Sequence, residues 1–371
     1  MSTINLVSFD VPYPPNYGGI INIFNTIRWL KKSNIEVLLH CFEYDNNPQT
    51  LELQKYCKEV IYYSRTKSII QIFSKTPFIT LSRKNDTLLK NLLTNDFPIL
   101  FEGIHCCYYI DNEHLNSRKK ILRVHNIEWQ YYLELSKQES NLLKKAFLYL
   151  EYFKLKKYES IVQYADLVLS VNYNENSFFK QFNTNVVHFP CLHNNDEINI
   201  LEGKGNYVLY HGSLNVIENE VAVLWLIENV CSKLPHISFI IAGKKPSNKL
   251  LKIIESIDNV VLKSNLSLKE MDQLIQNAQI IILFSHQNTG IKLKLIDTLF
   301  KARFCVANEN IVFGTEVENT YFLAHTPSEF INQIEQLFDK ELTVEMIEQR
   351  KEILQNKFNN QNSIHVLIDV L

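Results

Sequence analysis

The stretch HQNTGIKLKLIDTLFKARFCVANE, residues 286–309, decides the fold of this chain. It follows the apolar run 280–284, and it contains a turn with Gly290, helical periodicity over 291–301 and a second apolar run over 304–307. A strand, a glycine turn, a helix and a further strand are the parts of a βαβ unit, in which the two strands pair in parallel. The stretch therefore predicts an α/β protein built on a parallel sheet.

The first helical turn of this stretch also predicts a binding site. Gly290 leaves the amides at the start of the helix free to bind a phosphate or a sugar hydroxyl. At about 3.6 residues per turn, Lys294 and Asp297 share the face of Gly290, whereas Lys292 points elsewhere. A cation and a carboxylate on one edge suit a diphosphate and a ribose diol. The alternative is a surface ion pair between Lys294 and Asp297, worth only about a few tenths of a kcal/mol.

Apolar runs alternate with helix-length amphipathic segments over the whole chain. Strands are expected at 4–11, 36–42, 60–63, 98–102, 120–124, 167–171 and 186–189, and again at 207–210, 238–242, 260–262, 280–284 and 304–307. In the second series, helices are expected near 219–234, 267–277, 291–301 and 326–340.

A polar, irregular segment at 192–206 separates the two series and predicts a linker. At about 150 residues per domain, a chain of 371 residues accommodates two domains. We place them at 1–191 and 207–345. The last segment, 346–371, is expected to be a helix that returns to the first domain.

Composition indicates a globular protein and excludes several classes. Apolar residues make up 46% of the chain and charged residues 21%, so a sizeable core can form. A formal net charge of −2 provides no positive field for nucleic acid, and no nucleic-acid partner is expected. The seven cysteines contain no C-x-x-C pair, which favours reduced core thiols. No apolar stretch reaches the ~18 residues of a membrane span and no basic signal region begins the sequence, so we expect a cytoplasmic protein.

Two glycine-containing loops follow predicted strands, at the edge where open parallel sheets bind ligands. PYPPNYGG ends in Gly18 and Gly19, which either let backbone amides approach an anion or form a plain tight turn. HGSLNVIEN contains Gly212 and Ser213, whose amides and hydroxyl could meet a diphosphate.

A histidine follows another predicted strand. In RVHNIEWQYY, His125 can position an acceptor hydroxyl or stabilise charge on a departing sugar, although an ordinary hydrogen-bonded histidine fits the pattern as well. His105 is a weaker candidate of the same type.

The segment 139–164 carries many lysines. We interpret it as a long core helix with a solvated outer face. The alternative is a face that binds a membrane surface, at the inner side of the membrane, or an acceptor phosphate.

Taken in this order, the segments resemble the retaining glycosyltransferases of family 4, the group 1 class with the GT-B fold. The points of contact are P-Y-P-P-x-x-Y-G-G, R-x-H-N-x-E, H-G-S-L with Asn219, A-G-K at 242–244, and T-G-I-K-L-K-L-I-D. The likeness covers nearly the whole chain. It implies two Rossmann-like parallel-sheet domains facing across a cleft, with the acceptor bound by the first and the nucleotide-sugar donor by the second.

The resemblance implies roles for individual residues. Asp297 matches the acid that holds the donor ribose, and Lys294 matches the cation near the diphosphate. His125 is the expected catalytic residue, placed near the donor sugar. The expected donor-binding residues are Gly19, Gly212, Ser213, Gly290, Ile291, Lys294 and Asp297. The expected acceptor-side residues are Tyr17, Gly18, His105 and Glu128.

Two features depart from the family pattern. Its E-x7-E acids read Thr289 and Asp297 here, which shortens the ribose ligand by one methylene. The Arg/Lys pair expected after the first donor-domain strand is missing, because 211–219 contains no cation.

The function implied by the resemblance is transfer of a sugar, with retention, from a nucleotide sugar to a glycan or lipid-linked glycan in cell-surface polysaccharide synthesis. The sequence contains no D-x-D, so we expect no metal and no other cofactor. The altered acidic positions leave open a catalytically weak sugar-nucleotide-binding subunit of a polysaccharide assembly complex. A nucleotide-sugar epimerase of the same fold would need paired carboxylates that the sequence does not clearly offer.

Overall fold

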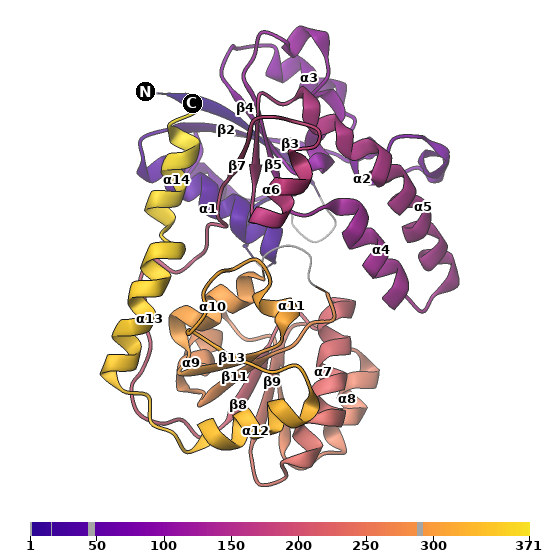
Figure 1. Cartoon of the computed structure of the whole chain (residues 1–371). Coiled ribbons are helices and arrows are strands. Elements are labelled where there is room, and N and C mark those ends of the chain that lie inside the picture. The colour runs from indigo at the N-terminus through magenta and orange to yellow at the C-terminus, as the bar shows by residue number, and fades with distance from the viewer. Residues whose placement is uncertain (1, 16, 44–48, 288–291) are drawn as a thin grey trace. The chain divides into compact units, whose positions relative to one another are not determined.

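The computed structural model describes residues 2–15, 17–43, 49–287 and 292–371 of the chain (Figure 1). The chain divides into two compact units. One unit consists of Met1–His193 together with Asn360–Leu371, and the other of Asn194–Asn359. Each unit has its own parallel sheet, as the sequence predicts.

In the described part of the first unit, seven strands form one sheet in the order β3-β2-β1-β4-β5-β6-β7. Every pairing in it is parallel. The strands are β1 (Thr3–Ser8), β2 (Glu36–Phe42), β3 (Glu59–Tyr63), β4 (Ile99–Glu102), β5 (Lys120–Val124), β6 (Leu167–Ser170) and β7 (Val186–His188). The adjacent strands β1, β4 and β5 are buried along their whole length, as expected of a parallel sheet covered on both faces.

Helix α1 (Gly18–Lys32) follows β1 and shows how apolar spacing dictates packing. Ile20, Ile23 and Ile27 recur every three or four residues, so they share one face, and all three are buried. Asn34, with φ 59°, then turns the chain toward β2 in the left-handed conformation that asparagine tolerates better than most residues.

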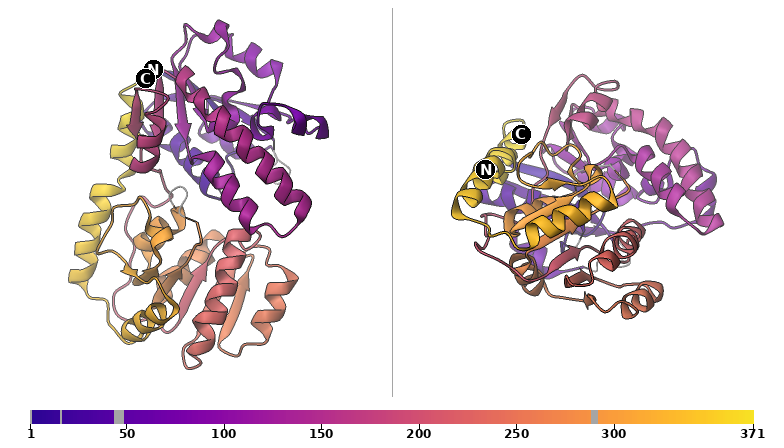
Figure 2. Two further views of the ribbon diagram at one scale, coloured as in Figure 1. Left: turned by 45° about the vertical axis from the view of Figure 1, so that its right-hand side comes forward. Right: turned by 60° about the horizontal axis from the view of Figure 1, so that its bottom comes forward.

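The remaining helices of this unit are α2 (Phe78–Leu81), α3 (Asp86–Leu92), α4 (Glu128–Gln138), α5 (Leu142–Tyr158), α6 (Tyr173–Phe179) and α14 (Asn360–Ile368), with short 3-10 segments η1 (Leu51–Lys55), η2 (Ile69–Phe73), η3 (Ile104–Tyr109), η4 (Glu113–Leu115) and η5 (Glu159–Tyr164). Helices α4 and α5 lie side by side as a helical hairpin (Figures 1 and 2). Only Glu151 and Leu155 of α5 are buried, so the expectation of a core helix over 139–164 is wrong.

In the described part of the second unit, six parallel strands follow the order β10-β9-β8-β11-β12-β13. The strands are β8 (Val208–His211), β9 (Phe239–Gly243), β10 (Val260–Ser264), β11 (Ile280–Leu283), β12 (Phe304–Ala307) and β13 (Phe322–Leu323). The helices are α7 (Ile217–Asn229), the 3-10 segment η6 (Cys231–Lys233), α8 (Asn248–Glu255), α9 (Leu268–Asn277), α10 (Leu293–Lys301), α11 (Glu309–Val312), α12 (Pro327–Phe338) and α13 (Val344–Lys357). The short strand β13 was not expected from the sequence.

The C-terminal segment differs from the single helix expected over 346–371. Two helices, α13 and α14, occupy it, and the break near Phe358 coincides with the boundary between the units. Only α14 belongs to the first unit, where it packs against α1 and adds Ile364 and Leu367 to the core.

All seven cysteines lie in the described part of the chain, are buried and form no disulfide there. Among the described helices, none combines the length and apolar character that crossing a bilayer requires.

Candidate functional site

The first unit gathers polar side chains at the carboxyl ends of its adjacent central strands. Asp10 comes shortly after β1, Glu102 is the last residue of β4, and His125 directly follows β5. Because β1, β4 and β5 are parallel neighbours, their carboxyl ends lie at one edge of the sheet. This is the edge at which open α/β sheets bind ligands.

His125, the expected catalytic residue, is hydrogen-bonded to a buried acid that sequence reasoning missed. Its Nε2 lies 2.8 Å from Oε2 of Glu102. The side chain of Glu102 is 0% exposed, whereas that of His125 keeps 11% of its surface exposed. The sequence did contain an indication of Glu102, because this residue ends a predicted apolar strand and His125 was selected by its place directly after one.

The rings of Phe9 and His105 explain two of the glycines. Phe9 contacts His125 edge-on, with ring centroids 5.8 Å apart, and it packs on His105 at 5.0 Å. A Cβ atom on Gly19 would lie 2.8 Å from Cζ of Phe9, and one on Gly103 would lie 2.9 Å from Nδ1 of His105. Close packing against these rings therefore requires glycine at both positions, whether or not Gly19 also meets a phosphate.

His105 has a different environment from His125. Burial lowers its pKa well below the usual range, with Arg83 and His125 adding to the shift, so the ring is neutral near pH 7. Its Nδ1 is buried and has no hydrogen-bond partner among the residues that the structure describes. The expected acceptor-side role of His105 stays a prediction.

The loop before α1 is tied to the end of β1. The hydroxyl of Tyr17 donates a hydrogen bond of 2.7 Å to Oδ2 of Asp10, and the amide of Val11 donates one of 2.7 Å to Oδ1. Burial raises the pKa of Asp10, although both hydrogen bonds oppose the shift. Gly18 is the first residue of α1 and follows Tyr17 directly. Tyr17 and Gly18 therefore lie at the same sheet edge as His125.

Glu128, at the first position of α4, is a carboxyl group that titrates near neutrality. Burial raises its pKa to about 7, against a hydrogen bond with Asn126 and the charge of Arg83. Nearby Glu159 has its pKa raised to about 9, by burial first and by Glu128 second, so it is protonated at pH 7. An acid with a pKa near the working pH can exchange a proton with a substrate.

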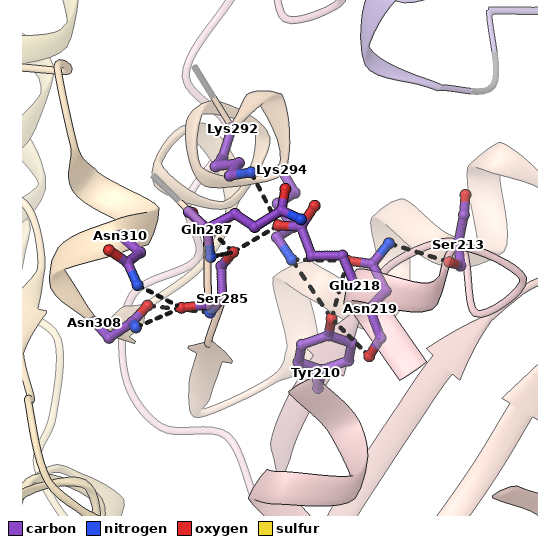
Figure 3. A network of polar contacts seen from close by, with 10 residues as sticks. All are labelled: Tyr210, Ser213, Glu218, Asn219, Ser285, Gln287, Lys292, Lys294, Asn308 and Asn310. Atoms are coloured by element: carbon purple, nitrogen blue, oxygen red, sulfur yellow. Dashed lines mark hydrogen bonds and ion pairs between the residues drawn. The ribbon is translucent and has the colours of Figure 1, made fainter. Parts of the chain in front are cut away.

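The second unit holds a network of polar contacts around the end of β11 and the start of α7 (Figure 3). Nζ of Lys292 lies 2.9 Å from Oε1 of Glu218, and the hydroxyl of Ser285 donates to the same oxygen. Although burial opposes it, the charge of Lys292 and these hydrogen bonds lower the pKa of Glu218. Lys292 and Lys294 have different partners: Lys292 pairs with Glu218, and Lys294 contacts Asn219, the next residue of α7.

Lys294 supplies a cation beside the connection between β8 and α7. Its Nζ lies 3.1 Å from Oδ1 of Asn219 and 3.4 Å from the hydroxyl of Tyr210 (Figure 3). Burial lowers its pKa to about 8, with Glu218 opposing the shift and Lys292 adding to it. The segment 211–219 has no cation of its own, and α10 brings one to it.

Asp297 pairs with a lysine other than the one considered from the sequence. Its Oδ1 lies 2.6 Å from Nζ of Lys301, one turn further along α10, and Lys301 also lies 2.6 Å from Asp272. The alternative prediction, an ion pair between Asp297 and Lys294, is therefore wrong. The side chain of Asp297 keeps 29% of its surface exposed, which leaves room for a ligand.

Gly212 and Ser213 are tied into the fold. The amide of Gly212 donates to the carbonyl of Ala242 at 3.0 Å, so this amide is already engaged. The side-chain amide of Asn219 donates to the carbonyl of Ser213 at 3.0 Å. Gly290 and Ile291 lie outside the described residues, so their expected contacts stay predictions.

Gln287 is a residue that sequence reasoning missed. It follows β11, its side chain is buried, and its carboxamide lies next to Glu218 in Figure 3. Neither its Oε1 nor its Nε2 has a hydrogen-bond partner within the described part of the chain. Its position shortly after the buried strand β11 could have indicated it from the sequence.

Comparisons with known proteins agree with this architecture. No family model matches the sequence. An uncharacterized 44.6 kDa protein in the cps region of Klebsiella pneumoniae is 26% identical over 326 residues, which span 83% of each chain. HepE from Anabaena, solved in complex with UDP and glucose, superposes with a TM-score of 0.67 at 11% identity over 99% of this chain and 98% of its own.

A second solved structure, the pneumococcal O-GlcNAc transferase GtfA in complex with UDP and GlcNAc, has a TM-score of 0.62 at 10% identity. It matches 100% of this chain and 98% of its own. The fold is GT-B. At these identities the likeness to solved structures concerns the fold, and function has to be argued from the residues.

Proposed function

We propose that this protein is a glycosyltransferase that transfers a sugar, with retention of configuration, from a nucleotide-sugar donor to a glycan or lipid-linked glycan. The observation that carries the proposal is the pair Lys292 and Lys294 at the start of α10, with Lys294 beside the β8–α7 connection. In such a reaction negative charge develops on the departing nucleoside diphosphate, and preorganised cations stabilise it.

The neighbours suggest which donors to try first. HepE was solved with UDP and glucose, and GtfA with UDP and GlcNAc, so UDP-sugars are the first candidates here. The Klebsiella relative comes from a cps region, which supports an acceptor that belongs to a cell-surface polysaccharide.

The decisive assay measures nucleotide release from UDP-, GDP- and ADP-sugars with and without lipid-linked oligosaccharides. Acceptor-dependent release of one nucleotide, with the anomeric configuration of the product determined by NMR, would support the proposal. Nucleotide binding without release in any combination would favour a second candidate, a sugar-nucleotide-binding subunit of a polysaccharide assembly complex. The observation that favours this candidate is the altered acidic pattern, with Thr289 and Asp297 in place of the two glutamates of the family that the sequence resembles.

Substitution of Asp297 tests whether its carboxylate binds the donor ribose. Charge-assisted hydrogen bonds contribute roughly 1.5–3 kcal/mol, so Asp297→Asn is expected to weaken binding of UDP and of the UDP-sugar alike, by about tenfold or more. Asp297→Glu keeps the charge and is expected to bind nearly as well as the wild type. Isothermal titration calorimetry on the three proteins provides the comparison.

An ion pair that only stabilises the fold predicts another pattern. Asp297→Asn would then bind UDP normally, and because the pair with Lys301 is partly exposed its loss would change stability by no more than about 1 kcal/mol. Equal affinities in all three proteins would remove Asp297 from the donor site.

We propose that no metal ion takes part in the transfer. Lys294 and the amides of a helix start can balance the diphosphate charge, so activity is expected to survive EDTA. The measurement is the initial rate before and after dialysis against EDTA. Loss of activity that Mn²⁺ restores would contradict this.

We further propose that the enzyme works against an anionic membrane surface through one face of α5. Leu142, Ala146, Tyr149 and Phe153 are spaced as one helix face, and each is exposed. Leu143, beside them, is 83% exposed. Lysines 144 and 145 are exposed next to this apolar stripe. An apolar stripe flanked by lysines suits insertion between anionic lipid headgroups.

Replacing Leu142 and Leu143 together by serine is expected to reduce binding to vesicles that contain anionic lipid by at least about tenfold, since buried leucines contribute about 1.5–3 kcal/mol each. Cosedimentation measures the effect. Leu268→Ser provides a matched control, because Leu268 is 68% exposed on a helix of the other unit. Equal binding of all variants, or no preference for anionic lipid, would contradict the proposal.

A further inference from the structure

The buried carboxylate of Glu102 lies between His125 and Arg123. Its Oε2 is hydrogen-bonded to Nε2 of the imidazole at 2.8 Å, and its Oε1 lies 3.9 Å from a guanidinium nitrogen of Arg123. Both Glu102 and Arg123 are 0% exposed. The buried guanidinium of Arg123 therefore contacts the buried carboxylate of Glu102, which in turn contacts the partly exposed imidazole of His125.

The buried cation is held by contacts of its own. Arg123 donates to the hydroxyl of Thr26 at 2.8 Å and to the carbonyl of Pro190 at 3.3 Å, and its guanidinium lies over the ring of Phe189 at 4.3 Å. Arg123 and Glu102 face each other in the parallel register of β4 and β5. The strand pairing therefore fixes where the carboxylate sits.

The orientation of the imidazole is also constrained by packing. Phe9 meets it edge-on, and Cδ2 of His125 lies 3.6 Å from the place where a Cβ of Gly103 would be. Nε2 is directed at the carboxylate, and no hydrogen bond to Nδ1 occurs within the described residues. One ring nitrogen faces a buried anion, which leaves the other for a ligand.

A carboxylate can only accept a hydrogen bond, so it selects the tautomer that carries the proton on Nε2. We propose that Glu102, backed by Arg123, is a positioning residue that holds His125 in the Nε2–H tautomer and presents Nδ1 as the basic atom to a substrate hydroxyl. This inference rests on the proposed function for its substrate, but the tautomer is a property of the protein alone. As the hydroxyl oxygen forms its bond to the anomeric carbon of the donor sugar, Nδ1 accepts the proton of that hydroxyl. The bond from the same carbon to the diphosphate breaks, the nucleoside diphosphate leaves, and the imidazolium is stabilised by Glu102.

The first experiment needs no variant. Protein labelled with ¹⁵N-histidine, with the His125 signals assigned by comparison with His125→Asn, is expected to show a protonated Nε2 and an unprotonated Nδ1 at a pH where the ring is neutral. A protonated Nδ1 in the wild-type protein would overturn the proposal.

The second experiment changes the partner. In Glu102→Gln the carboxamide oxygen is expected to turn toward Arg123 and its NH₂ toward Nε2, which forces the proton onto Nδ1. In the serine proteases, which contain the best-known histidine–carboxylate pair, the wrong tautomer lowers kcat on the order of 10⁴-fold. We expect kcat to fall by at least about a hundredfold, with the dissociation constant of UDP unchanged.

Glu151→Gln provides the matched control. Glu151 is equally buried in the same unit and pairs with Lys154 at 2.6 Å, but it is not bonded to a histidine. Its substitution is expected to leave the tautomer of His125 and kcat near wild-type values. A Glu102→Gln protein that loses stability while keeping both the tautomer and kcat would reduce Glu102 to a structural ion pair. Absence of turnover in the wild type would contradict the proposed function instead, and the tautomer would still decide this inference.

Discussion

His125→Ala is expected to lower kcat by about a hundredfold or more while leaving the dissociation constant of UDP within about twofold of wild type. A positioned acid–base group contributes about 10²–10⁴-fold to a rate. His125 has the geometry of such a group, with Nε2 bonded to Glu102 and 11% of the side chain exposed. A role confined to the reacting centre predicts that kcat falls while nucleotide affinity does not. Steady-state kinetics and calorimetry on the same preparation separate the two quantities.

A second histidine at the end of a strand supplies the control. His188 is the last residue of β7, and its Nε2 contacts the carbonyl of Val171 at 3.2 Å. His188→Ala is expected to retain most of its activity. If His125→Ala instead unfolds at a lower temperature but keeps its specific activity, His125 is an ordinary structural histidine.

Lys294→Met is expected to weaken UDP binding by about 10- to 100-fold at pH 7. Methionine keeps much of the length of the side chain but removes the ammonium, and a hydrogen bond to a charged group contributes roughly 1.5–3 kcal/mol. Lys301→Met is the control on the same helix, because Lys301 is engaged by Asp297 and Asp272. It is expected to bind UDP more tightly than Lys294→Met does.

The same lysine predicts how affinity depends on pH. The pKa of Lys294 is lowered to about 8, so the ammonium is largely present at pH 7 and largely lost at pH 9. A bound diphosphate favours the charged form, so binding above pH 8 must take up a proton and affinity falls with rising pH. We expect UDP to bind about tenfold more weakly at pH 9 than at pH 7 in the wild type, and a much smaller change in Lys294→Met. Parallel pH dependence in both proteins would place Lys294 outside the diphosphate site.

Much of the fold could be predicted because each strand and helix is encoded locally. Runs such as the one at 280–284 are short, apolar and bounded by turns, and they form strands within two residues of the expected ends, except that the strand expected at 4–11 ends three residues early, at Ser8. The C-terminal segment was harder to predict. A continuous helical periodicity over 346–371 does not reveal that the chain breaks near Phe358 and that its two halves pack on different cores.

The surface of α5 also escaped prediction. A segment that alternates leucines, aromatic residues and lysines has the composition of a core helix with a solvated face. In the structure its neighbour α4 covers only part of it, and Leu142 and Leu143 remain exposed. Whether an apolar residue of a helix is buried depends on which other elements pack against it, and the sequence of the helix alone does not specify those elements.

The sequence by itself determined the α/β class, the two sheets and the positions at strand ends where ligand-binding residues gather, since apolar periodicity and turn residues act within a few positions. Only the tertiary structure decided which side chains meet. Glu102 reaches His125 from 23 residues away through the register of β4 and β5. Lys294 reaches Asn219 from 75 residues away because β11, the strand before α10, pairs with β8, the strand before α7. Such pairs depend on how a helix is rotated and how two strands are aligned, and packing among residues distant in the chain sets both.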